Sequence, residues 1–194
     1  AREHAVRLAG ERGAHMVPSF HADLVRGVAS YWVEFFASFA TGEAPEVVFV
    51  PIGLGSGICA CAAARAHAGV RTRIVGVVSA HAPAYRLSFE AGRAIEAPVS
   101  TLLADGMACR VPEPQALAII QREVDEIVSV SDDEVAAAMR AFFADTHNVA
   151  EGAGAAALAA LLQQRERWAG RRVGLSLSGG NVDSAQFARV LAAG

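Results

Sequence analysis

Residues 47–60 read VVFVPIGLGSGICA, and this stretch decides the fold. The apolar run 46–50 is typical of a strand that is buried on both faces of a parallel sheet. Glycines alternate at positions 53, 55 and 57, and an alanine-rich segment follows them. Because glycine adopts positive φ at little steric cost, such a turn can present successive backbone N–H groups to one point. The stretch therefore predicts a strand, an anion-binding turn and a helix whose dipole favours the anion.

The alternation of strands and helices continues along the chain. Apolar runs and helical spacing predict further strands at 73–78, 126–130 and 172–177, and helices at 1–12, 21–40, 57–67, 83–91, 114–123, 131–144, 154–165 and from 183 onward. Residues 98–114 are predicted to form a loop, and Ser131 with Glu134 forms a capping box. The pattern predicts an α/β fold with a largely parallel, twisted sheet that is flanked by helices.

Composition excludes several classes of function. The chain has 194 residues, 53% of them hydrophobic and 19% charged, which indicates a folded domain rather than a disordered one. Its net charge of -3 gives no reason to expect a nucleic acid or an anionic membrane as partner. No apolar run approaches the roughly 20 residues that cross a bilayer, and no signal peptide is evident. Three scattered cysteines predict neither a disulfide framework nor a structural zinc site, so we expect a cytoplasmic protein. No second histidine or cysteine stands at ligand spacing from His147, so we expect no metal.

The chain contains no lysine. All 17 of its basic residues are arginines. Any mechanism that requires a lysine amine therefore cannot be completed by this sequence alone.

Taken alone, the glycine turn is a weak signal. It does not satisfy the dinucleotide fingerprint, because Ile58 stands where the third glycine belongs, and it is not a P-loop. Three other segments are equally ambiguous. Ser178 lies in LSLSGGNVD at the end of the last predicted strand, Glu151 lies in NVAEGAGA before a helix, and Gly106 lies in LADG. Each of them also fits a structural role as a cap, a first-turn carboxylate or a turn.

Together and in this order, the four segments resemble those of the threonine dehydratase and serine racemase family, which are pyridoxal-phosphate enzymes of fold type II. The resemblance spans nearly the whole chain and implies pyridoxal 5'-phosphate as cofactor. It implies that the cofactor phosphate is held by main-chain N–H groups of the turn, which comprises Gly53, Leu54, Gly55, Ser56 and Gly57. It further implies that Ser178 meets the pyridine nitrogen, that Glu151 lies near the ring and that Gly106 lines the substrate side.

The resemblance also implies a reaction. A serine hydroxyl, unlike a carboxylate, does not keep the pyridine nitrogen protonated, so the ring is a weaker electron sink. This suits β-elimination, in which L-threonine or L-serine is converted to a 2-oxo acid and ammonia. A racemase of the same family remains an alternative. The family commonly forms homodimers or larger homo-oligomers, and the aromatic residues of helix 21–40 (Trp32, Phe35 and Phe36) fit either an interface or the core.

The sequence departs from the family in one important respect. The lysine that binds the cofactor and the loop that binds the substrate carboxylate lie upstream of everything present here, so we assign no catalytic residue. We expect residues 1–19 to be the tail of the small domain, and residues 20–194 to be the cofactor-binding large domain without its N-terminal arm. Residues 77–83 carry no acidic side chain, so no divalent-cation site is expected there.

Two further classes of function are possible. A lysine-free domain can hold a phosphorylated ligand without catalysis, which makes a binding module the main alternative. A nucleotide-binding oxidoreductase is disfavoured, because the third glycine and a convincing ribose-binding acid are both missing.

Overall fold

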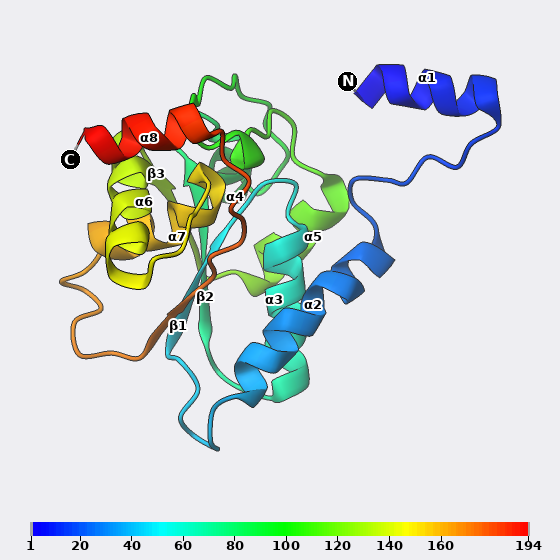
Figure 1. The fold of residues 1–194 in the computed structure, drawn as a ribbon. Helices are drawn as coiled ribbons and strands as arrows, with labels where there is room; N and C mark the ends of the chain where they lie inside the picture. The colour runs from blue at the N-terminus through cyan, green and yellow to red at the C-terminus, as the bar shows by residue number, and fades with distance from the viewer. Residues whose placement is uncertain (1, 194) are drawn as a thin grey trace.

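The structure is a computed structural model that describes residues 2–193, with side chains from residue 4 onward (Figure 1). Its centre is a four-stranded parallel sheet in the order β3-β2-β1-β4. The strands are β1 (Val47–Pro51), β2 (Arg73–Ser79), β3 (Glu126–Val130) and β4 (Val173–Leu175). The helices are α1 (Arg2–Arg12), α2 (Ala22–Ala37), α3 (Ser56–Ala68), α4 (Ala84–Ala91), α5 (Pro114–Glu123), α6 (Asp132–Thr146), α7 (Gly152–Gln163) and α8 (Ser184–Ala192), with a short 3₁₀ turn η1 (Asp105–Met107). The expected α/β class with a parallel sheet is confirmed.

Helices cover both faces of the sheet (Figure 1). On one face, α2, α3 and α5 pack over a core that includes Trp32, Ile58 and Ile120. On the other face, α6 and α7 pack over a core that includes Phe49 and Met139. Burial of both faces explains why β1 is apolar without alternation: residues 47–50 are at most 1% exposed.

The aromatic residues of α2 belong mainly to the core. Trp32 is 1% exposed and Phe36 is 4% exposed. Phe35 is partly buried and reaches β4, where a Cβ on Gly174 would lie 2.6 Å from its Cζ atom. Of the two roles open to these residues, the structure therefore supports the core.

Most element boundaries agree with the sequence pattern, and the differences have physical reasons. The strand at 126–130, the helix at 114–123 and the Ser131–Glu134 capping box are confirmed. The prediction of a strand over 172–177 is wrong in length, because β4 pairs only with β1 and ends at Leu175. The chain then bends toward α7, where the Glu151 N–H donates to the Gly179 carbonyl oxygen at 3.0 Å.

Helix α7 begins two residues earlier than predicted, at Gly152 rather than Gly154. Both glycines are buried in close backbone contacts. A Cβ on Gly152 would collide with the Leu103 carbonyl, and one on Gly154 would lie 2.5 Å from the Gly179 carbonyl oxygen. Tertiary packing therefore overrides the low helix propensity of glycine here.

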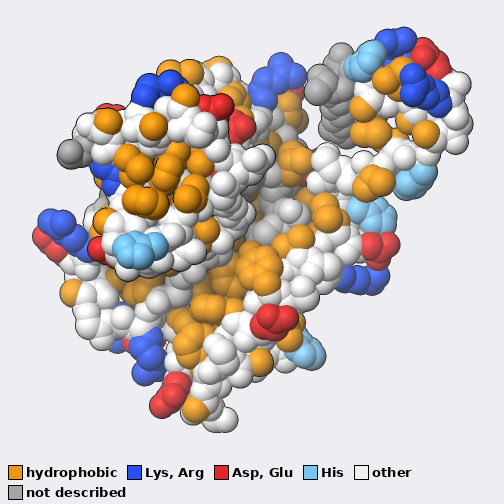
Figure 2. All heavy atoms as spheres, viewed as in Figure 1, with side chains coloured by type: hydrophobic (Ala, Val, Ile, Leu, Met, Phe, Trp, Pro, Cys, Tyr) orange, Lys and Arg blue, Asp and Glu red, His pale blue; other side chains and the backbone are white. Residues whose placement is uncertain are grey.

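Helix α1 stands apart from the body and is joined to it by residues 13–21 (Figures 1 and 2). The predicted helix over 1–12 is confirmed for residues 2–12, and residue 1 lies outside the described part. On the face drawn in Figure 2, hydrophobic side chains gather over α2 and toward β4. Large hydrophobic residues that remain exposed include Leu24, Tyr31 and Leu177. Within residues 2–193, no helix has both the length and the hydropathy that crossing a bilayer requires.

Candidate functional site

The glycine turn lies at the carboxyl end of β1 and leads directly into α3. Gly55 is the N-cap of α3 and has a φ of +100°, which glycine adopts readily and a larger residue rarely does. Within residues 2–193, no protein acceptor is recorded for the backbone N–H groups of residues 53–57. Unpartnered N–H groups at a helix start make a ready anion site, and the helix dipole adds to it.

Four of the five residues of the turn remain at least partly exposed. Leu54 is 38% exposed, so its side chain faces solvent. Ser56 and Gly57 are half-buried at the start of α3, as is Gly53 after β1, whereas Gly55 is buried.

The Ser178 segment lies at the same carboxyl ends of the strands. Strand β4 is parallel to β1 and pairs Phe49 with Leu175, so both strands end on the same side. Ser178 follows three residues after Leu175 and is exposed. No hydrogen bond of its hydroxyl to another described residue is recorded, which leaves the hydroxyl available to a ligand.

Gly106 connects the glycine turn with the other segments. A Cβ on Gly53 would collide with the Gly106 carbonyl oxygen, so the two backbones are in contact. A Cβ on Gly106 would lie 2.9 Å from Cβ of Ala153 and 3.6 Å from Oε1 of Glu151. The LADG segment therefore lies between the turn and the start of α7.

Glu151 completes the cluster. As the N-cap of α7, it is half-buried, and its Oε2 atom accepts from the Asn181 N–H at 3.0 Å. A Cβ on Gly179 would lie 2.6 Å from its Oε1 atom, so only glycine leaves room for the carboxylate. Through Gly106 and Gly179, the structure brings all four predicted segments together at the carboxyl ends of the strands.

The sequence pattern did not indicate three residues that support this site. The Tyr85 hydroxyl donates to the Leu54 carbonyl oxygen at 2.7 Å, and the Trp32 indole N–H donates to the Gly57 carbonyl oxygen at 3.2 Å. The Asp132 carboxylate accepts from the Thr101 hydroxyl at 2.7 Å and from the Leu102 N–H at 2.8 Å, which holds the LADG loop. The need of a buried Tyr or Trp for a polar partner was the only available signal.

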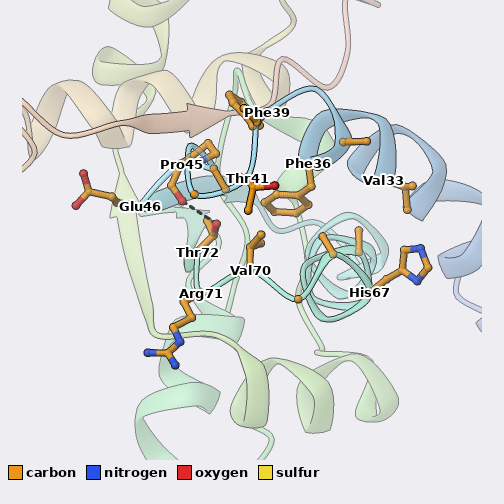
Figure 3. A pocket seen from close by; sticks show the side chains of 17 residues that line it. Val33, Phe36, Phe39, Thr41, Pro45, Glu46, His67, Val70, Arg71 and Thr72 are labelled. Carbon is orange, nitrogen blue, oxygen red and sulfur yellow. Dashed lines mark hydrogen bonds between the residues drawn. The ribbon is translucent and has the colours of Figure 1, made fainter.

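A hollow of about 640 Å³ lies elsewhere, at the amino ends of strands β1 and β2 (Figure 3). It is lined by the ends of α2 and α3 and by residues that precede β1 and β2, including Phe36, Val70 and Thr72. The Thr72 hydroxyl, a polar group of this lining, already donates to the Pro45 carbonyl oxygen at 2.7 Å. The hollow shares no residue with the predicted site, and ligands of open parallel sheets bind at the carboxyl ends of the strands.

Comparison with known proteins finds relatives over nearly the whole chain. The chain is 38% identical over 182 residues to an L-threonine ammonia-lyase of Geobacter sulfurreducens. This match covers 92% of this chain and 44% of the relative. It is also 34% identical over 190 residues to a phenylserine dehydratase of Ralstonia pickettii, and this match covers 97% of this chain and 57% of the relative.

A solved structure is similar as well. The processed form of threonine deaminase isoform 2 from Solanum lycopersicum superposes with a TM-score of 0.88 at 25% identity, over 97% of this chain and 52% of that one. The chain thus spans about half the length of the relatives that it matches. The family model of the pyridoxal-phosphate dependent enzymes matches residues 1–179. The resemblance found in the four segments is therefore confirmed, and the chain belongs to the family of pyridoxal-phosphate dependent enzymes.

Proposed function

We propose that the protein containing this chain is an ammonia-lyase that uses pyridoxal 5'-phosphate to dehydrate and deaminate a small β-hydroxy amino acid, L-threonine or L-serine. The observation that carries the proposal is that the glycine turn lies with the Ser178 and Glu151 segments at the carboxyl ends of the strands. Within residues 2–193, no protein acceptor is recorded for the N–H groups of this turn. Similarity to an L-threonine ammonia-lyase supports the choice of reaction.

The residues present fit the cofactor. The N–H groups of Gly53, Leu54, Gly55, Ser56 and Gly57 would hold its phosphate. The dipole of α3, which begins at Ser56, would add to the attraction of these N–H groups for the phosphate. The exposed Ser178 hydroxyl would meet the pyridine nitrogen as a neutral hydrogen-bond partner.

When bound, pyridoxal phosphate supplies an electron sink for the bonds at the α-carbon of an amino acid. This chain's own residues hold and orient that group. Contact of Gly106 and Gly179 with Glu151 places a carboxylate between the phosphate turn and the Ser178 segment. The Asn181 N–H fixes one carboxylate oxygen, which leaves the other facing Gly106, on the side where the substrate is proposed to bind.

The proposal extends to domain organisation. Residues 1–19 would belong to a small domain, and residues 20–194 to the cofactor-binding large domain. The separation of α1 from the body and the exposed apolar side chains over α2 support this division. The lysine that the family's chemistry requires would come from outside this chain, which has none.

We also propose a cytoplasmic location and a homodimer or larger homo-oligomer, without a nucleic acid partner. The net charge of -3 supports the last point. A metal is not part of the proposal.

The test uses the longest natural protein that contains this chain. Purified with pyridoxal phosphate, it should release ammonia and a 2-oxo acid from L-threonine or L-serine. Phenylserine is a useful third substrate, because a phenylserine dehydratase is among the relatives. Formation of the D-amino acid without ammonia would favour a racemase. A protein that binds pyridoxal phosphate but transforms none of these substrates would favour the binding module.

A further inference from the structure

Tyr85 contacts the glycine turn through a side-chain hydrogen bond. It belongs to α4, 31 residues beyond Leu54, and is 1% exposed. Its hydroxyl donates to the Leu54 carbonyl oxygen at 2.7 Å and accepts from the Glu113 N–H at 3.0 Å. One buried hydroxyl therefore links the turn to the start of α5.

These hydrogen bonds fix the orientation of one peptide plane. In a trans peptide, the carbonyl and the following N–H point in opposite directions. No cis peptide bond occurs among the described residues. Because the Leu54 carbonyl points at Tyr85, the N–H of Gly55 points away from Tyr85.

The same hydrogen bond removes an obstacle to anion binding. A carbonyl oxygen that faced the open side of the turn would repel a phosphate, whereas Tyr85 holds the Leu54 oxygen on the protein side. Close packing limits alternative orientations of this peptide. A Cβ on Gly55 would lie 2.7 Å from Cβ of Ala116 and 3.2 Å from the Tyr85 hydroxyl oxygen.

We propose that Tyr85 is a positioning residue for the phosphate of pyridoxal phosphate, acting by holding the Leu54–Gly55 peptide with its N–H directed at that phosphate. Tyr85 itself does not touch the ligand. The inference rests on the proposed function, since it takes the turn to be the phosphate site. It predicts that removal of one hydroxyl weakens recognition of the phosphate without affecting recognition of the pyridine ring.

The test compares Tyr85→Phe with Tyr31→Phe in the longest natural protein that contains this chain. Tyr31, the other of the two tyrosines, is 39% exposed. Its hydroxyl oxygen lies 4.0 Å from where a Cβ on Gly57 would be. No hydrogen bond of Tyr31 to the turn is recorded within residues 2–193. Both variants remove a tyrosine hydroxyl near the turn, but only one removes a hydrogen bond to it.

Apoprotein is titrated with pyridoxal phosphate and with pyridoxal, which lacks the phosphate, and binding is followed by absorbance. Tyr85→Phe should weaken the binding of pyridoxal phosphate roughly tenfold, the usual effect of losing one buried hydrogen bond. It should leave pyridoxal binding within about twofold, and Tyr31→Phe should change neither.

The outcomes separate the two proposals. If the wild-type protein does not bind pyridoxal phosphate, the proposed function fails. If the wild type binds it and Tyr85→Phe binds it equally well, or loses pyridoxal to the same degree, only the positioning role is overturned.

A measurement on the wild type covers the case in which Tyr85→Phe does not fold. Amide exchange of residues 53–57 should slow when inorganic phosphate or pyridoxal phosphate is added, and should not change with pyridoxal. Unchanged exchange of the Gly55 amide with pyridoxal phosphate bound would overturn the role of Tyr85.

Discussion

At the scale of single residues, the site depends on glycines that allow backbones to touch. Gly53 lies against the Gly106 carbonyl, and Gly179 lies against the Glu151 carboxylate. Neither contact is visible in a one-dimensional sequence, because the partners are 53 and 28 positions away along the chain. Glycine at these positions serves close approach as well as backbone conformation.

The Gly53 contact can be tested by adding one methyl group. Gly53→Ala should lower the free energy of unfolding by about 1–3 kcal/mol, because the new Cβ meets the Gly106 backbone rather than a flexible side chain. The matched control is Gly27→Ala in α2, where a Cβ has no neighbour within 4 Å. Since alanine is the better helix former, the control should gain about 0.5–1 kcal/mol. Urea denaturation measures both variants, and equal stability of the two would contradict the contact.

Ser178 is expected to affect function without affecting stability. It is exposed, so Ser178→Ala should change the free energy of unfolding by less than about 0.5 kcal/mol. If its hydroxyl meets the cofactor ring, turnover should fall roughly tenfold or more. Ser184→Ala, an exposed serine at the start of α8, is the control and should retain full turnover. Steady-state assays of ammonia release compare the two, and wild-type turnover of Ser178→Ala would remove the assigned role.

At the scale of elements, the position of Gly106 depends on a clamp between the LADG loop and α6. Asp132 is in the first turn of α6 and accepts hydrogen bonds from the side chain of Thr101 and the backbone of Leu102. Thr101 in turn accepts from the Ala104 N–H at 3.0 Å. The capping box at Ser131 and Glu134 was predictable from local spacing, whereas this clamp joins residues about 30 positions apart.

Asp132→Ala should therefore loosen the loop while α6 remains folded. We expect a loss of about 1–2 kcal/mol in the free energy of unfolding, from two hydrogen bonds to a carboxylate. Hydrogen exchange of residues 101–106 should become faster. The control is Asp133→Ala, which removes an exposed carboxylate of the same helical turn and so has a similar effect on the helix dipole. If both variants exchange alike in the loop, the clamp does not hold it.

The elements themselves were largely predictable, and the limits were physical. β3 and α5 have clear ends, since Pro114 begins the helix and an apolar run with flanking charges defines the strand. The length of β4 was not predictable, because it depends on where pairing with β1 stops. For the site, local motifs indicated the four segments, but the supporting hydrogen bonds of Tyr85 and Trp32 depend on tertiary packing.

At the scale of the whole molecule, three buried thiols report on the integrity of the fold. Burial raises the pKa of Cys59 to about 12, and it raises the pKa values of Cys61 and Cys109 as well. The native thiols should therefore resist alkylation at pH 8. Once unfolded, where a thiol pKa is about 8.5, all three should react. Labelling followed by mass spectrometry tests this, and rapid native labelling would contradict the packing.

The same shifts give a pH dependence of stability. Below about pH 8.5 the thiols are protonated in both states and contribute no difference. As the pH rises toward about 12, the unfolded state loses thiol protons that native Cys59 retains, so stability should fall. Cys59→Ala should reduce this alkaline decline, as measured by denaturation at pH 7.5 and pH 10. An unchanged decline would indicate that other groups cause it.

The pairing of β1 with β4 has a consequence for biosynthesis. Glu46, just before β1, and Arg171, just before β4, form an ion pair across 125 positions of sequence. While a ribosome makes the intervening residues, β1 has no neighbour on that side, and an unpaired apolar edge invites association with other nascent chains. Binding of pyridoxal phosphate would be equally late, because Ser178, whose hydroxyl is proposed to meet the pyridine ring, is synthesised only after β4. A chain whose translation stopped before β4 would therefore leave this apolar edge exposed and would be prone to aggregate.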